Sequence, residues 1–153
     1  GEIIAGVIYD AAQDECFFAE KGQGAWMNET RMRVSGRRSL SDCVFATGLP
    51  SLCRSDLPQA LADLAQLLPA SSGVRNLGAA ALDMAYVAAG RVDGFWGRRL
   101  QLWDVAAGMI IVKEAGGFSE SIQLGGDPLQ YGTVIAANDQ VFAPFSKIIR
   151  KNS

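Results

Sequence analysis

The sequence predicts an α/β protein of layered construction, in which antiparallel strands at the N-terminus are followed by alternating strands and helices. Residues 2–35 read as short β-rich runs separated by polar and Gly-rich turns, a pattern typical of an antiparallel meander. From residue 43 onward, strand-like and helix-like runs alternate, which favours helices packed on a sheet. The composition, with 49% hydrophobic and 20% charged residues, is that of an ordinary globular chain.

The N-terminal elements follow from β-rich runs and the turns between them. Strands are expected over residues 3–10 and 15–20, separated by the polar AAQD. Residues 21–35 contain Gly-rich turns and a short alternating segment that extends the meander.

The remaining elements are expected to alternate along the chain. A helix at 55–69 has Pro58 close to its start, as the first turn of a helix tolerates. The predicted strands are 43–49, 73–78, 91–97, 117–121 and 131–138, and the predicted helices are 55–69, 79–90, 104–117 and 140–151. No repeat, low-complexity tract or linker divides the chain.

Two of these helices are rich in small residues, which let neighbouring backbones approach closely. The helix at 104–117 is apolar around most of its circumference until Lys113, so we expect it to be buried. Gly116 follows its last turn and suits the left-handed position after a helix end.

Charge and residue counts exclude several function classes. A net charge of −2 gives no footprint for DNA or RNA binding. Three cysteines without CxxC spacing indicate neither a zinc site nor a disulfide framework and fit a reducing cytoplasm. No apolar run approaches a membrane span, and no signal peptide is recognised.

The chain has no histidine, which excludes Ser-His-Asp and Cys-His catalysis and leaves carboxylates, hydroxyls, backbone groups and bound metal.

Asp104 is an acid at the start of an apolar helix, directly after Trp103. As a helix cap, it would accept hydrogen bonds from the N–H groups of Ala106 or Ala107. As a functional group, it would face a cleft walled by Trp103 and bind a hard cation such as Mg²⁺, which prefers oxygen ligands. One oxygen can cap while the other binds metal, so both interpretations stay open.

Gly78, Ala79 and Ala80 open another helix without bulky side chains. Their N–H groups are free to meet a polar ligand, as the first N–H groups of helices do. The alternative is that small residues here serve close packing alone.

The run WDVAAGMIIVKEAGG resembles the C-terminal signature of the inositol monophosphatase family, W-D-x-A-A/G followed by an apolar helix ending in E-A-G-G. AEKGQGAWMN, NLGAAALDMAYVAAGRVDGFW and YGTVIAAN resemble further family segments in the same order. The bacterial extragenic-suppressor type is the most similar, and the resemblance extends over nearly the whole chain.

The resemblance implies a layered α+β sandwich of the sugar-phosphatase type and a Mg²⁺-dependent phosphomonoesterase, usually a homodimer. It implies that Asp104 binds a metal ion and that Gly78, Ala79 and Ala80 contact a phosphorylated polyol substrate. Ser51, in TGLPS, matches a serine that lines the same pocket. The resemblance assigns none of the present residues a directly catalytic role.

The family motif D-P-I/L-D-G-T, which holds the metal ions and receives phosphate, is absent from this sequence. We therefore expect residues 1–153 to be the C-terminal portion of a single unit, with residues 1–36 ending the first sheet and residues 37–153 forming a second α/β layer. Mg²⁺ needs several oxygen ligands, so we expect this chain alone to be inactive.

Gly97 stands where the family usually has an acid that binds inositol hydroxyls, which predicts weaker polyol recognition. Arg98 or Arg99 would instead favour a substrate with a second anionic group.

Three functions remain open for the parent protein. The first is hydrolysis of inositol monophosphate or a similar small phosphomonoester. The second is binding to a cytoplasmic protein or RNA-processing assembly, with catalysis weak or lost. The third is hydrolysis of a sugar bisphosphate or a 3′-phosphorylated nucleotide.

Overall fold

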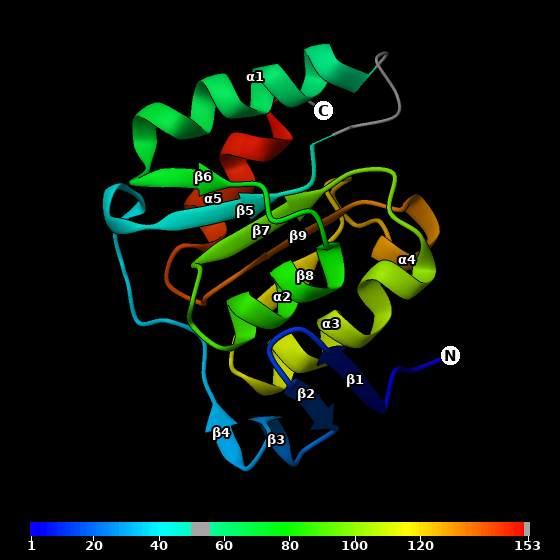
Figure 1. The fold of residues 1–153 in the computed structure, drawn as a ribbon. Helices are drawn as coiled ribbons and strands as arrows, with labels where there is room; N and C mark the ends of the chain where they lie inside the picture. Colours follow the sequence, from blue (N-terminus) through cyan, green and yellow to red (C-terminus); the bar gives the residue numbers. More distant parts are fainter. Residues whose placement is uncertain (50–55, 152–153) are drawn as a thin grey trace.

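The computed structural model describes residues 1–49 and 56–151, which form alternating layers of helix and sheet (Figure 1). Helices α1 (Leu57–Leu67) and α5 (Phe142–Arg150) cover one side of a five-stranded sheet. Helices α2 (Ala80–Ala88) and α3 (Leu102–Glu114) lie between that sheet and a four-stranded sheet. The predicted α/β layered fold class is confirmed.

The four-stranded sheet is the predicted antiparallel meander, in the order β1-β2-β3-β4. Its strands are β1 (Ala5–Asp10), β2 (Glu15–Glu20), β3 (Gly24–Met27) and β4 (Thr30–Met32). Ile8 pairs with Phe17, and both are buried toward the helix layer, whereas Val7 and Tyr9 on the alternate positions are exposed. The period of two along a strand explains this division between faces.

The five-stranded sheet has the order β6-β5-β7-β9-β8. Its strands are β5 (Val44–Thr47), β6 (Gly73–Arg75), β7 (Gly94–Gly97), β8 (Phe118–Glu120) and β9 (Val134–Ala137). Strand β5 runs parallel to β6 and β7, and β9 runs antiparallel to β7 and β8. Thr47 pairs with Trp96, so β5 and β7 end at the same edge of the sheet.

Small residues bring the middle helices close to their neighbours, as expected. A Cβ on Gly108 of α3 would lie 2.7 Å from the Cβ of Met84 on α2. A Cβ on Gly6 of β1 would lie 2.8 Å from the Cα of Ala107. Helix α3 ends before Gly116, whose φ of +89° is the predicted left-handed conformation.

Short elements that were not predicted also occur within residues 1–49 and 56–151. A 3₁₀ turn forms at Leu40–Asp42, and the one-turn helix α4 (Pro128–Tyr131) begins after Asp127, whose carboxylate accepts the Leu129 N–H at 2.9 Å. Such elements are too short for a periodic pattern. Within the described segments, every helix is too short or too polar to cross a membrane.

Candidate functional site

Asp104 lies in the first turn of α3. This helix follows the end of β7 after a short loop (Figure 1). The helix begins at Leu102 after the cap residue Gln101, two residues earlier than predicted. Asp104 is therefore the third helical residue, and its Oδ2 accepts the Gln101 N–H at 2.8 Å. The prediction that Asp104 accepts hydrogen bonds from the N–H groups of Ala106 or Ala107 is wrong. The helix begins at Leu102, so these two residues lie beyond its first turn. A capping contact is present, but it reaches back to the residue before the helix.

The second carboxylate oxygen of Asp104, Oδ1, has no hydrogen-bond or ion-pair partner among residues 1–49 and 56–151. The side chain is half-buried, so water and ions can reach it. Trp103 is 76% exposed, so its expected role as a wall of the site stays a prediction. A negative charge is also favoured here by the positive end of the helix dipole.

Asp104 supplies one oxygen ligand and not a complete metal site. Across the described part of the chain, no three Cys, Asp or Glu side chains are grouped so that they could hold a metal ion. Mg²⁺ requires several oxygen ligands in near-octahedral order. The described residues therefore fit one position of a Mg²⁺ site and do not form the whole of it.

The segment Gly78–Ala80 starts α2 with an open backbone. Gly78 is exposed, has a φ of +85°, and has no atom within 4 Å of the position of a Cβ. Ala79 is the cap residue and offers no side-chain hydrogen bond to the helix. The first N–H groups of α2 therefore receive no hydrogen bond from the side chain of the cap residue. A backbone contact to substrate requires such uncapped N–H groups. Ser51 lies outside the described residues, so its role stays a prediction.

Gly97 is the last residue of β7 and is buried. It pairs with Val134 of β9. A Cβ at this position would lie 2.7 Å from Leu100 Cδ1 and 3.0 Å from Phe95 Cζ. An acid here would have to displace the side chain of Leu100.

Arg98 and Arg99 each form an ion pair with an acid of the protein. Arg98 Nε lies 3.1 Å from Asp63 Oδ2, and Arg99 forms an ion pair with Asp56. The expectation that one of them recognises a second anionic group therefore has no support in this geometry.

The sequence alone assigned no role to three acids, and two of them, Asp63 and Glu114, make specific contacts. Asp63 of α1 is 1% exposed and holds Arg98. Glu114, the acid of E-A-G-G, accepts the N–H groups of Gly22 and Gly24 at 2.9 Å each. The hydrogen bond from Gly22 is the main reason that the pKa of Glu114 is lowered. Glu114 is part of a quoted motif, but its partners Gly22 and Gly24 lie about 90 residues away in the sequence. The spacing of residues in the motif therefore does not predict these contacts.

Asp83, the third of these acids, lies on α2 three residues after Ala80 and is fully buried. Neither carboxylate oxygen has a hydrogen-bond partner among the residues that the structure describes. Burial raises the pKa of this carboxyl to about 7. An apolar helix carrying one acid was the only signal in the sequence.

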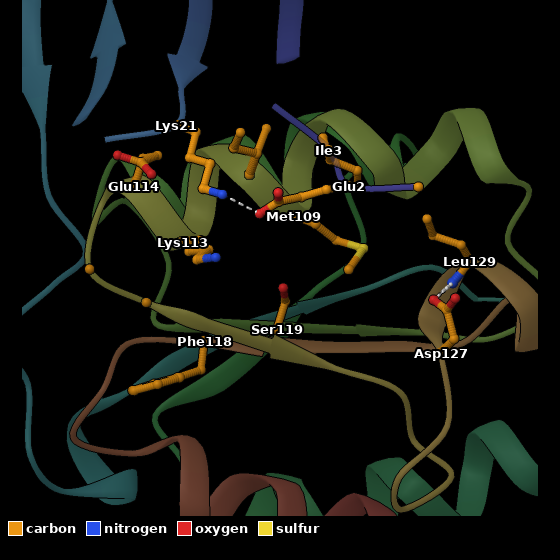
Figure 2. Close-up of a pocket in the computed structure, with 14 residues that line it drawn as sticks. Glu2, Ile3, Lys21, Met109, Lys113, Glu114, Phe118, Ser119, Asp127 and Leu129 are labelled. Atoms are coloured by element: carbon orange, nitrogen blue, oxygen red, sulfur yellow. Dashed lines mark hydrogen bonds and ion pairs between the residues drawn. The ribbon is translucent and has the colours of Figure 1, made fainter. Parts of the chain in front are cut away.

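A cavity of about 580 Å³ lies beside the second half of α3 (Figure 2). Met109 and Lys113 of α3, Ile3, Ser119 and Leu129 are among its lining residues. Asp104 is not among them, so this cavity is separate from the candidate site. Nothing in its lining indicates a particular ligand.

Comparisons with known proteins agree with the motifs. A family model described as the inositol monophosphatase family matches residues 1–151. The inositol-1-monophosphatase of Mesorhizobium japonicum is 47% identical over 151 residues, covering 99% of this chain and 57% of that protein. The putative Nus factor SuhB of Neisseria meningitidis serogroup B is 39% identical over 149 residues, covering 97% of this chain and 57% of that protein.

A solved structure also matches the fold. The crystal structure of extragenic suppressor protein suhB from Bartonella henselae has a TM-score of 0.94 and 47% identity, covering 99% of this chain and 58% of that chain. The chain thus spans about 57% of the length of the curated relatives it matches.

Proposed function

The chain belongs to the inositol monophosphatase family, and from that premise we propose that the complete protein is a Mg²⁺-dependent phosphatase for inositol monophosphate or a similar small phosphomonoester. The observation that carries this proposal is the Asp104 carboxylate at the start of α3, with Oδ2 bound to Gln101 and Oδ1 without a partner in the described segments. One oxygen fixes the side chain and the other is available to a cation.

The residues of this chain prepare the site in distinct ways. The Gln101 N–H fixes the orientation of Asp104, so that Oδ1 is presented without loss of side-chain freedom on binding. Gly78, Ala79 and Ala80 offer backbone N–H groups to the polar leaving group of the substrate. When bound, Mg²⁺ would polarise the phosphate and acidify a water molecule.

The remaining metal ligands are proposed to come from polypeptide outside this chain, because the described residues contribute one carboxylate. We accordingly propose that the 153-residue chain is the C-terminal portion of the catalytic unit and is inactive alone. A homodimer is proposed from the family, and a cytoplasmic location is proposed from the three cysteines without CxxC spacing.

The direct test assays the complete polypeptide with Mg²⁺ and inositol monophosphate. Asp104→Asn keeps an oxygen acceptor for Gln101 but removes the charge, so kcat/KM should fall by about 100-fold or more. Asp127→Asn is the matched control, because the Asp127 carboxylate also caps a helix, the short helix α4 that begins after it. Turnover that is unchanged in Asp104→Asn would refute the role of this residue.

A second function has its own support. Relatives at 39% identity carry the name Nus factor SuhB, and Gly97 occupies the position of the family acid. On this basis the complete protein binds a cytoplasmic protein or RNA-processing assembly, with catalysis secondary. Efficient Mg²⁺-dependent turnover that disappears in Asp104→Asn would count against lost catalysis.

The third function, hydrolysis of a sugar bisphosphate or a 3′-phosphorylated nucleotide, is weakened by the ion pairs of Arg98 and Arg99. A panel of mono- and bisphosphates decides between it and the first.

A further inference from the structure

Asp63 is a buried carboxylate on α1 that binds donors from another part of the sequence. Its side chain is 1% exposed. Oδ2 accepts the indole N–H of Trp96 and the Nε–H of Arg98, each at 3.1 Å. Oδ1 accepts Arg98 Nη2 at 3.3 Å and Gln59 Nε2 at 3.2 Å. Arg98 therefore approaches the carboxylate with two of its nitrogens.

These contacts fix the point where β7 passes into the loop before α3. Trp96 and Arg98 lie on either side of Gly97, so Asp63 holds the chain immediately before and after the strand end. At the far end of the loop, the Leu100 N–H donates to Gly132 O at 2.8 Å. The Gln101 N–H then donates to Asp104. The loop that leads to Asp104 is thus held at both ends.

Stability alone gives a weak explanation of this arrangement. Removing two charges from water is costly, and well-packed apolar residues often stabilise a core as well as an ion pair does. An Arg–carboxylate pair with two contacts does supply fixed geometry, because the guanidinium is planar and its donors are rigid. The pair also affects charge. Asp63 neutralises the Arg98 guanidinium, whose side chain is 22% exposed.

We propose that Asp63 is a positioning residue of the candidate site. Through Arg98 and Trp96 it sets the position of the loop before α3, and thereby of Asp104. By holding Arg98, it also prevents that cation from binding a second anionic group of the substrate. This inference rests on the proposed phosphatase function and extends it to a preference for phosphomonoesters with a single anionic group.

The test compares the complete wild-type polypeptide with Asp63→Asn, using readouts that a loss of stability alone would leave unchanged. The first readout is the indole NMR signal of Trp103, which is next to Asp104 and is not a partner of Asp63. The second is the Mg²⁺ midpoint, the free Mg²⁺ concentration at which half of the folded protein has bound the ion in a calorimetric titration. We expect the Trp103 signal to shift and the Mg²⁺ midpoint to rise at least about fivefold.

A third readout addresses Arg98. The ratio of KM for a sugar monophosphate to KM for the matching bisphosphate should rise at least about threefold in Asp63→Asn, because the freed guanidinium attracts the additional charge. An unchanged ratio would overturn the assignment of substrate preference. An unchanged Trp103 signal and Mg²⁺ midpoint would overturn the positioning role.

Two further variants separate positioning from folding. The double variant Asp63→Leu with Arg98→Met replaces the ion pair by apolar groups and should fold, yet it should still shift the Trp103 signal. Arg150→Met removes an arginine that binds Glu120 and the carbonyl of Ser121, and it should lower Tm without moving any of the three readouts. If the complete polypeptide cleaves no phosphomonoester, the proposed function fails, while the Trp103 signal still decides whether Asp63 positions the loop.

Discussion

At the level of single residues, the two oxygens of the Asp104 carboxylate differ in their contacts. Asp104 serves the helix with Oδ2 and leaves Oδ1 without a partner in the described segments. The sequence left capping and metal binding open as compatible alternatives. The geometry shows the capping contact and keeps the second alternative available.

Asp83 allows a prediction on pH and stability. Burial raises its pKa to about 7 in the folded chain, whereas the unfolded carboxyl titrates near 3.8. Between those values the folded state keeps a proton that the unfolded state releases, so this group's contribution to stability falls as pH rises from about 4 to about 7. Asparagine at position 83 does not titrate, so Asp83→Asn lacks this loss of stability. The difference in unfolding free energy between Asp83→Asn and wild type should therefore move in favour of the variant by about 2 kcal/mol from about pH 5 to about pH 8.

Urea unfolding of the complete polypeptide at both pH values measures this difference. Asp10→Asn is the control, because Asp10 is also buried but accepts hydrogen bonds from Ala12 and Gln13 and should not gain stability. Parallel pH profiles for wild type and Asp83→Asn would show that Asp83 has a partner or is ionised in the fold.

At the scale of elements, α3 connects the two sheets and carries the candidate ligand. Its first turn holds Asp104, its middle packs on α2 through Gly108, and its end binds the β2–β3 turn through Glu114. The helix fixes the position of Asp104 relative to both sheets because each of its parts contacts a different element.

The contact between α2 and α3 can be tested with Gly108→Ala. Alanine gains about 1 kcal/mol in helix propensity over glycine. Its Cβ would lie 2.7 Å from Met84 Cβ, and such overpacking costs about 1–3 kcal/mol. We expect a net loss of about 1 kcal/mol in unfolding free energy, measured by urea titration. Gly36→Ala, where the Cβ meets open space, should change stability by less than about 0.5 kcal/mol; equal effects would contradict the packing argument.

Much of this element structure could be predicted because it depends on local patterns. The strand at 15–20 agrees with β2 at both ends, and the long apolar run around Ile111 gave α3. The start of α3 was placed two residues late, because Gln101 is a weak cap signal in a sequence whereas Asp104 is a strong one.

The candidate site was only partly predictable. The positions of Asp104 and Gly78–Ala80 at helix starts could be predicted because helix starts have local signatures, whereas their binding roles stay predictions. Two partners of Asp63, Trp96 and Arg98, lie 33 and 35 residues away from it. The sequence alone therefore did not show that Arg98 is bound by an acid of α1. Contacts between distant segments depend on tertiary packing, which spacing in the sequence does not specify.

At the scale of the whole molecule, the family is confirmed over residues 1–151, and the chain spans about 57% of its curated relatives. The four-stranded sheet exposes Val7, Tyr9 and Phe18 on the face away from the helices. The division into residues 1–36 and 37–153 remains a proposal, since α3 packs on the first sheet as well as on β8.

The 153-residue chain produced alone should show no Mg²⁺-dependent hydrolysis of inositol monophosphate, because one carboxylate cannot complete a Mg²⁺ site. A phosphate-release assay beside the complete polypeptide measures this, with circular dichroism as a check that the chain is folded. Turnover by the chain alone would show that its own residues suffice.

The most direct measurement is a crystal structure of the complete polypeptide with Mn²⁺ in place of Mg²⁺, using anomalous scattering to locate the ion. We expect an anomalous peak about 2.1 Å from Asp104 Oδ1, with the Gln101 N–H still bound to Oδ2. An ion bound elsewhere, with both oxygens of Asp104 taken by protein donors, would contradict it.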